Sequence, residues 1–259
     1  MATALITGAS AGLGSDFAKI LAGQKYDLIL TARNQERLKT LAGDLSRSHD
    51  VKCHIIVIDL SKPGSAVALS NQIKEQGLHV DVLVNNAGCG LWGPFAESDP
   101  ADMAGMIQLN VNSLTELTRQ LLPGMLARKK GRVLNVASTA GFQPGPWMAV
   151  YYATKAYVIS FGEALATELK STGVTVTTLC PGPTRTEFFD RAKMGKSRMK
   201  SLIFADSMTC AKNGIDSMDQ GRVLVVDGVL NWIFSQSSRL MPRAAIRVVT
   251  GSINAASKD

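Results

Sequence analysis

The sequence of 259 residues is poor in the side chains that build disulfide frameworks and metal sites. Its four cysteines lie far apart and form no Cys-x-x-Cys pair, so we expect buried thiols in a reducing, cytoplasmic environment. Its three histidines have no metal-ligand spacing, and we expect no metal site. The residues before Gly8 contain neither a basic region nor a small-residue cleavage site, so we expect no secretory signal.

Long apolar runs and basic stripes are missing as well. No segment approaches the roughly 18 uninterrupted apolar residues of a membrane-spanning helix, so we expect no integral membrane segment. The formal net charge of +7 is modest and no aromatic residues are interleaved with a basic stripe, so we expect no nucleic-acid partner. A hydrophobic fraction of 46% and a charged fraction of 19% are typical of a globular protein with a sizeable core.

The sequence does contain a regular alternation of short apolar runs and helical patterns. Neither an internal repeat nor a low-complexity linker interrupts this alternation. It predicts an α/β fold with a doubly wound parallel sheet, Rossmann-like, in three α/β/α layers and a single domain over residues 1–259. The predicted strands are 3–7, 27–32, 52–58, 80–84, 132–137, 174–179 and 222–226.

A glycine-rich loop, Gly8-Ala9-Ser10-Ala11-Gly12-Leu13-Gly14, connects the first predicted strand to the first helical pattern. A dinucleotide pyrophosphate requires this order, because glycines let the backbone approach the phosphates and a helix N-terminus offers them free N–H groups. The glycine spacing is G-x-x-x-G-x-G rather than the commoner G-x-G-x-x-G, and a merely tight turn is the alternative.

Two charged residues follow the next strands. Arg33 stands where an acid would bind the ribose 2′-hydroxyl of NAD, and its guanidinium suits a 2′-phosphate instead. This favours NADP(H), with NAD(H) possible, although Arg33 could also be a solvated strand-end residue. Asp59 ends the third strand, where it could contact the adenine or serve as a helix cap.

The run Tyr151-Tyr152-Ala153-Thr154-Lys155 opens a predicted helix, and Ser138 lies thirteen positions upstream after an apolar strand. Tyr151 and Lys155 are four residues apart and therefore share one helix face. A nearby ammonium lowers the pKa of a phenol, which could then exchange a proton with a carbonyl or alcohol oxygen. Taken alone, such a spacing is common by chance.

Together these motifs resemble the short-chain dehydrogenase/reductase family in its compact form of about 250 residues, over roughly residues 3–186. Asn85-Asn86-Ala87-Gly88 is similar to the family motif that supports the central sheet, and Asn110 falls at the position of the family's catalytic asparagine. The resemblance implies a catalytic set of Asn110, Ser138, Tyr151 and Lys155. It implies cofactor contacts from Gly8, Ser10, Ala11, Gly12, Leu13, Gly14, Arg33, Asp59, Leu60, Asn86, Ala87, Gly88, Tyr151, Lys155, Pro181, Gly182, Thr184 and Thr186.

The resemblance also implies a mechanism in which the nicotinamide and a substrate carbon exchange a hydride. Tyr151 transfers the proton on oxygen, and Lys155 lowers its pKa and hydrogen-bonds the nicotinamide ribose. Ser138 orients the substrate oxygen, and Asn110 holds a water that links Lys155 to solvent. The expected function is an NADPH-preferring oxidoreductase acting on a small carbonyl/alcohol pair. A non-catalytic dinucleotide-binding sensor or scaffold is the alternative.

Two segments carry no readable motif. Residues 184–205 are predicted to form a substrate flap, whose basic residues fit either an acidic substrate or a solvated surface. The tail, 227–259, is apolar and basic, and could pack on a partner subunit, cover the substrate cleft or touch a membrane surface. From the family's habit we expect a homodimer or homotetramer.

Overall fold

The computed structural model describes residues 1–192, 194, 197 and 205–256, so part of the predicted flap at 184–205 lies outside the described residues. The strands are β1 Thr3–Thr7, β2 Asp27–Ala32, β3 Cys53–Val57, β4 Val82–Asn85, β5 Gly131–Val136, β6 Val174–Cys180 and β7 Leu224–Val226. The helices are α1 Gly12–Gly23, α2 Gln35–His49, α3 Ser65–Glu75, α4 Pro100–Ile107, α5 Leu114–Ala127, α6 Ala149–Glu168, α7 Phe188–Arg191, α8 Ser207–Asp219, α9 Val229–Leu240 and α10 Arg243–Asn254. All seven predicted strands form, with bounds that differ by no more than two residues.

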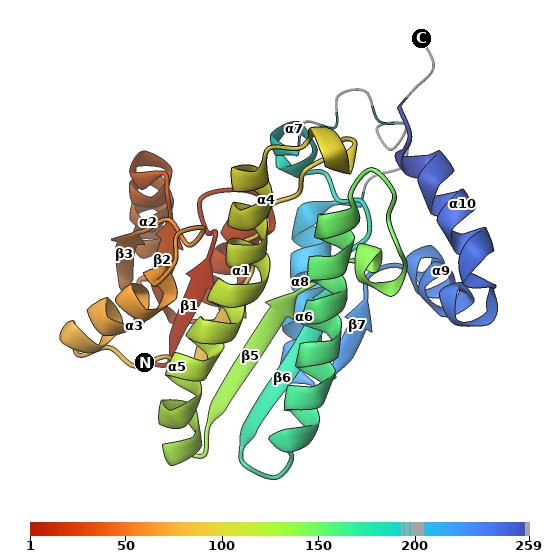
Figure 1. Cartoon of the computed structure of the whole chain (residues 1–259). Helices are drawn as coiled ribbons and strands as arrows, with labels where there is room; N and C mark the ends of the chain where they lie inside the picture. Colours follow the sequence, from red (N-terminus) through yellow and green to blue (C-terminus); the bar gives the residue numbers. More distant parts are fainter. Residues whose placement is uncertain (193, 195–196, 198–204, 257–259) are drawn as a thin grey trace.

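The strands form one parallel sheet in the order β3-β2-β1-β4-β5-β6-β7. The chain first winds from β1 outwards to β3 and then from β4 outwards to β7, so the sheet is doubly wound as predicted (Figure 1). The direction of winding reverses between β1 and β4. Ligands of such sheets bind beyond the carboxyl ends of the strands at this point, which positions the site.

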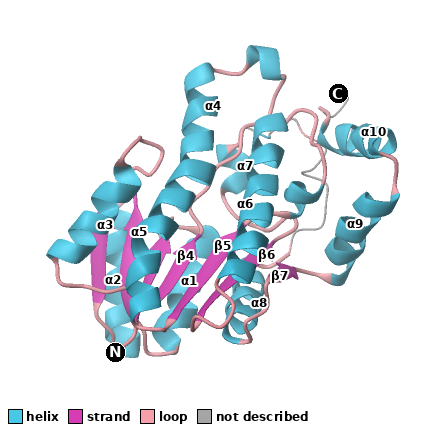
Figure 2. Cartoon of the chain, turned by 60° about the horizontal axis from the view of Figure 1, so that its bottom comes forward, coloured by secondary structure: helices cyan, strands magenta, loops and turns pink. Residues whose placement is uncertain are grey.

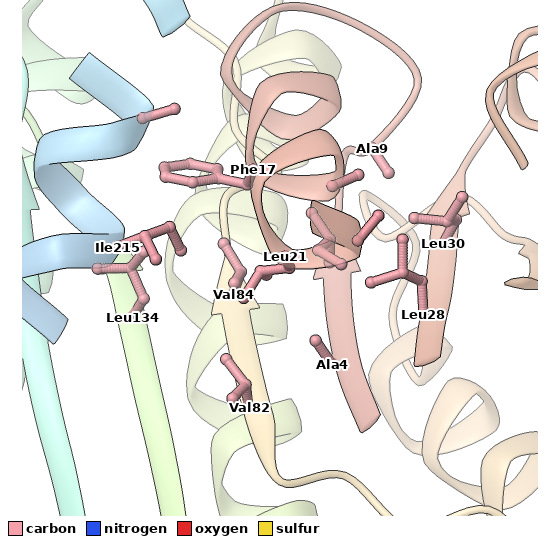
Figure 3. Packing of buried hydrophobic residues seen from close by; sticks show 14 of the residues in the cluster. Ala4, Ala9, Phe17, Leu21, Leu28, Leu30, Val82, Val84, Leu134 and Ile215 are labelled. Carbon is pink, nitrogen blue, oxygen red and sulfur yellow. The ribbon is translucent and has the colours of Figure 1, made fainter. Parts of the chain in front are cut away.

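Helices cover both faces of the sheet, and each face has its own hydrophobic core (Figure 2). Successive side chains of a strand point to opposite faces, so Ile6 packs under α1, α2 and α8 while its neighbour Leu5 packs under α3, α5 and α6. Figure 3 shows Phe17 of α1 directed toward α8, which carries Ile215, and Leu21 of α1 beside Val84 of β4. Burial on both faces is the reason that these strands are nearly continuous apolar runs.

The helical run from Pro100 to Ala127 is not one continuous α-helix. The helical run contains a π-helical segment, Gln108–Ser113, between α4 and α5. A π turn closes i→i+5 hydrogen bonds and so holds one residue more than an α turn. It turns Asn110 into the interior, where 2% of its surface is exposed, while Asn112 stays in solvent and bonds Gln108. The two mid-helix asparagines were the sequence signal of this irregularity.

The tail after β7 forms α9 and α10, which stand beyond the β7 edge of the sheet (Figures 1 and 2). Large apolar side chains of α9, including Trp232 and Ile233, are exposed. Among the described residues, no helix has the length and apolarity needed to cross a membrane. In the same residues, no cluster of three or more His, Cys, Asp or Glu side chains is arranged to hold a metal ion.

Candidate active site

A cleft of about 1320 Å³ runs along the carboxyl ends of the strands. Gly8 follows β1, Arg33 follows β2, Asn86 follows β4, and Ser138 and Pro181 follow β5 and β6; all five residues line the cleft. The cleft therefore spans the point where the winding of the sheet reverses.

The predicted site residues gather at this cleft, with two exceptions. Gly14 and Asn110 are not part of its lining and lie behind it, where each supports residues that are. The predicted residues that line the cleft are Gly8, Ser10, Ala11, Gly12, Leu13, Arg33, Asp59, Leu60, Asn86, Ala87, Gly88, Ser138, Tyr151, Lys155, Pro181, Gly182, Thr184 and Thr186.

The glycine-rich loop is held in a shape that a side chain would destroy. Gly8 has a φ of +70°, which favours glycine, and a Cβ on Gly14 would lie 2.2 Å from the carbonyl oxygen of Gly8. The Asn86 side chain fixes the loop from the other side, because its Nδ2 donates to the Thr7 carbonyl at 2.9 Å. The loop is therefore a preformed cradle that fits a pyrophosphate.

The N-terminus of α1 has no side-chain cap, in contrast to those of α2, α4 and α8. Asn34, Asp99 and Asp206 cap α2, α4 and α8 with a side-chain oxygen that accepts a backbone N–H. The corresponding residue of α1 is Ala11, which makes no side-chain cap, and no acid lies in the first turn. The first N–H groups of α1 are thus left to an external acceptor, as phosphate binding requires.

Arg33 and Asp59 lie together at the far end of the cleft from Tyr151. Arg33 is exposed, and its charge acts on Asp59. Burial raises the pKa of Asp59, but hydrogen bonds from Ser61 together with Arg33 and Lys62 outweigh it and hold the pKa below its usual value. Asp59 Oδ1 accepts hydrogen bonds from Ser61, at 3.0 Å from the backbone N and 2.7 Å from Oγ, but α3 begins only at Ser65 with Gly64 as its cap residue, so Asp59 closes a local turn and does not cap that helix.

Ser138, Tyr151 and Lys155 converge at the other end. The Tyr151 and Ser138 side chains are hydrogen-bonded, and the Lys155 ammonium lies 5.9 Å from the centroid of the Tyr151 ring. Lys155 Nζ donates to the carbonyl oxygen of Val136 at 2.8 Å. Tyr151 and Lys155 therefore share one face of α6, as their spacing predicts, and the serine comes from the end of the neighbouring strand.

The expected lowering of the Tyr151 pKa by Lys155 is wrong for this structure. Burial raises the pKa of Tyr151 well above its usual value, and only the hydrogen bond with Ser138 opposes that shift appreciably. The physical reason is that Tyr151 has 8% of its surface exposed, while the ammonium points to Val136 rather than to the phenol oxygen. A phenol in this setting stays protonated at neutral pH, as a proton donor must.

The pKa of Lys155 is shifted in the opposite direction, downward, and this shift makes the free energy of unfolding depend on pH. Burial lowers the pKa of Lys155 to about 8 from an ordinary value of 10.5. Between these values the unfolded chain binds more protons than the folded one, so folding becomes more favourable as pH rises from 8 to 10.5. Relative to Lys155→Met, the wild-type free energy of unfolding should therefore rise with pH, by about 3 kcal/mol at most.

Urea melts of both proteins across this pH range measure that difference. Lys170→Met is the control, because Lys170 is exposed just beyond the end of α6 and its removal should leave the pH dependence unchanged. A wild-type minus Lys155→Met difference that stays flat with pH would contradict the buried-ammonium interpretation.

Asn110 ties three segments together behind the cleft. Its Nδ2 donates to the Cys89 carbonyl at 2.9 Å and to Thr154 Oγ1 at 3.1 Å, and its Oδ1 accepts from the Cys89 N–H at 3.0 Å. A Cβ on Gly88 would lie 3.3 Å from Asn110 Oδ1 and 3.5 Å from Lys155 Nζ, so the missing side chain leaves room beside both. The π segment is what aims Asn110 at these partners.

The sequence did not reveal the apolar end of the cleft. Beside Tyr151 the lining passes to large apolar side chains from four helices, α4, α7, α9 and α10, and from three segments outside the helices. Of the roles expected for the tail, covering the cleft is the one that the structure shows. The sequence signal that could have revealed this role is the spacing of four between apolar residues of the tail, as in Leu230 with Phe234 and Val249 with Ile253. The apolar residues are Leu91, Met106, Met148, Phe188, Phe189, Met194, Leu230, Phe234, Val249 and Ile253.

Sheet topology, glycine cradle and cleft together define a Rossmann-like dinucleotide-binding protein. Comparison with known proteins narrows this class. A family model described as short chain dehydrogenase matches residues 2–196. The very-long-chain 3-oxoacyl-CoA reductase of Anas platyrhynchos is 32% identical over 243 residues, which are 90% of this chain and 75% of that protein. The chain belongs to the short-chain dehydrogenase family, whose members are oxidoreductases that use NAD(P)(H).

Solved structures agree with this family. A short-chain dehydrogenase from Sphingobium yanoikuyae in complex with NADPH superposes with a TM-score of 0.83 and 29% identity, covering 93% of this chain and 94% of that one. The bulky-bulky ketone specific alcohol dehydrogenase from Comamonas testosteroni superposes with a TM-score of 0.79 and 26% identity, covering 93% and 92%. The family and the doubly wound fold predicted from the sequence are thereby confirmed.

Proposed function

We propose that the protein is an NADPH-dependent reductase of carbonyl compounds that works with Asn110, Ser138, Tyr151 and Lys155. The observation that carries the proposal is the position of the hydrogen-bonded Tyr151–Ser138 pair. It lies between the phosphate cradle and the apolar end of one continuous cleft. A carbonyl held there would meet a proton donor on one side and the cofactor on the other.

The residues present fit a nicotinamide dinucleotide, which when bound supplies the hydride. Tyr151 donates its hydroxyl proton to the substrate oxygen, and the Ser138 hydroxyl positions that oxygen beside it. Lys155 keeps an ammonium 5.9 Å from the centroid of the Tyr151 ring, on the same helix face. Asn110 hydrogen-bonds the Cys89 backbone and Thr154, the residue before Lys155. It thereby fixes the position of Lys155 relative to the segment that contains Cys89.

The names of the relatives select the first substrates to test. Curated relatives are 3-oxoacyl-CoA reductases, and the apolar end of the cleft suits an aliphatic chain attached to the reacting carbonyl. The purified chain should consume NADPH when given 3-oxoacyl thioesters of increasing chain length or bulky apolar ketones. Failure to oxidise NADPH with any of these while still binding it would support the alternative, a dinucleotide-binding sensor or scaffold.

The preference for NADPH depends on Arg33, an exposed cation of the cleft wall. A charged hydrogen bond contributes about 1.5–3 kcal/mol. Arg33→Ala should therefore reduce the ratio of kcat/KM for NADPH to that for NADH by roughly tenfold or more. Steady-state kinetics with both cofactors measure it.

Arg37→Ala is the matched control for Arg33. Arg37 lies one helical turn away, outside the cleft lining, and pairs with Glu187 at 2.9 Å. Its loss should leave the cofactor ratio unchanged. An unchanged ratio in Arg33→Ala as well would mean that Arg33 is only a solvated strand-end residue.

We also propose that the protein is a homodimer or homotetramer, from the habit of its family. Size-exclusion chromatography with light scattering measures the mass in solution, and a monomer at micromolar concentration would contradict the proposal.

A further inference from the structure

The C-terminal helix α10 is attached to the body of the protein through its last residue, Asn254. One stripe of α10 is buried, formed by Ile246, Thr250 and Asn254 at intervals of four. Asn254 has 0% of its surface exposed. Burying an amide costs free energy unless the amide is hydrogen-bonded, so the hydrogen-bond partners of Asn254 indicate its structural role.

The partners of Asn254 come from four segments around the substrate end of the cleft, one of them Ser197, whose Oγ donates to the Asn254 carbonyl at 3.5 Å. The Tyr152 hydroxyl lies 3.2 Å from Oδ1, to which it donates, and 3.1 Å from Nδ2. Nδ2 also donates to the Pro146 carbonyl at 3.0 Å, and the Asn254 carbonyl accepts from Trp92 Nε1 at 2.7 Å. The side-chain amide of Asn254 thus joins α10 to the loop before α6 and to α6 itself, and its backbone carbonyl joins α10 to the loop after β4.

This joint, which consists of Asn254 with its partners Tyr152, Pro146 and Trp92, lies directly beside Tyr151. Tyr152 follows Tyr151 in the chain, and their rings meet edge-on with centroids 6.1 Å apart. Lacking a lysine four residues on, Tyr152 cannot repeat the Tyr151–Lys155 pairing. The structure gives its hydroxyl another partner, and that partner is the tail.

The joint also determines which side chains face the substrate. Val249 and Ile253, one turn apart on α10, line the cleft, and Leu230 and Phe234 do the same on α9. Neither pair adjoins the glycine cradle or Arg33, which belong to the opposite end of the cleft. If α10 were released, the apolar wall would be lost while the cofactor end stayed intact.

We propose that Asn254 is a positioning residue that fixes α10 as an apolar wall beside Tyr151, through Tyr152 and Pro146. The site thereby selects carbonyl substrates that carry a long apolar group. The inference rests on the proposed reductase activity and deepens it, because it assigns substrate selection to the tail.

Kinetics of Asn254→Ala and Tyr152→Phe with a long-chain and a short-chain 3-oxoacyl thioester test the proposal. Each variant should raise KM for the long chain roughly tenfold or more, change kcat less than about threefold, and leave short-chain kinetics and the Kd for NADPH nearly unchanged. The double variant should be no worse than the worse single variant, because both remove one joint. Asn254→Ala risks instability, whereas Tyr152→Phe removes one oxygen and keeps the ring.

Tyr157→Phe is the matched control. Tyr157 lies on the same helix, and its hydroxyl is 2.9 Å from Thr115 Oγ1, away from the tail. It should keep the wild-type chain-length preference. Equal losses for long and short chains in Tyr152→Phe, or an unchanged preference in both joint variants, would overturn the role of Asn254.

Amide hydrogen exchange separates this proposal from the proposed function. Exchange over 243–254 should accelerate in both joint variants and not in Tyr157→Phe, whether or not the protein turns over. A wild-type chain that reduces no carbonyl compound would overturn the reductase proposal and substrate selection with it. Unchanged exchange over 243–254 would overturn the joint itself.

Discussion

Tyr151→Phe should lower kcat for carbonyl reduction by about a thousandfold or more while the Kd for NADPH changes less than threefold. Loss of a positioned general acid typically costs about 10²–10⁴ in rate. The phenol oxygen is hydrogen-bonded to Ser138 and faces the cleft, whereas the ring packs on Phe188 at 5.2 Å between centroids and would be retained. Single-turnover absorbance of NADPH measures the chemical step, and fluorescence titration measures the binding.

Tyr152→Phe and Tyr157→Phe are controls of identical chemistry on the same helix. Neither should lower kcat by more than a few fold, because neither hydroxyl reaches the carbonyl site. Retained turnover in Tyr151→Phe would remove Tyr151 from the catalytic set, and the Ser138 hydroxyl would then be the next donor to test.

Gly14→Ala should weaken NADPH binding roughly a hundredfold and destabilise the fold by about 1–3 kcal/mol, the usual cost of overpacking. The added methyl would lie 2.2 Å from the Gly8 carbonyl oxygen and 2.6 Å from Asn86 Nδ2, and the first of these atoms belongs to the backbone. Only a shift of the loop could relieve the contact, and that shift would distort the cradle. Isothermal titration with NADPH and urea unfolding measure the two effects.

Gly43→Ala is the opposite case in the same domain. Gly43 lies within α2, and a Cβ there meets nothing within 4 Å. Since alanine is the better helix former, this variant should gain about 0.5–1 kcal/mol of stability and bind NADPH normally. Normal binding by Gly14→Ala would show that the loop is not the pyrophosphate cradle.

The sequence predicted those parts of the molecule that local rules govern. Strands buried on both faces must be apolar, and the carboxyl ends of parallel strands meet at one edge, so the glycine loop, Ser138 and the Tyr151–Lys155 pair could be placed together. The roles assigned to these residues stay predictions until the variants are measured.

Contacts between residues far apart in the chain, and the burial that results from such contacts, could not be predicted from the sequence. Asn254 meets Tyr152 across about a hundred residues, and no pattern links them. The Tyr151 pKa was mispredicted because spacing reveals the neighbouring ammonium but not the depth of burial, and burial dominates. The two asparagines signal an irregularity in the helical run, but they do not reveal that Asn110 reaches the Cys89 backbone, which is what the π segment makes possible.

That π segment has a consequence for anyone redesigning this helical run. Met106 and Leu117 are eleven positions apart, which on one α-helical wheel is about three turns and places them on the same side. Yet Met106 packs with Tyr151 and Tyr152, whereas Leu117 packs on the sheet. The buried faces of α4 and α5 must therefore be plotted on two separate helical wheels. Because the π segment holds one residue more than the equivalent α turn, a one-residue deletion within Gln108–Ser113 would restore ordinary α-helix and leave the two faces nearly where they are, whereas the same deletion within α4 or α5 would rotate one half against the other by about 100°.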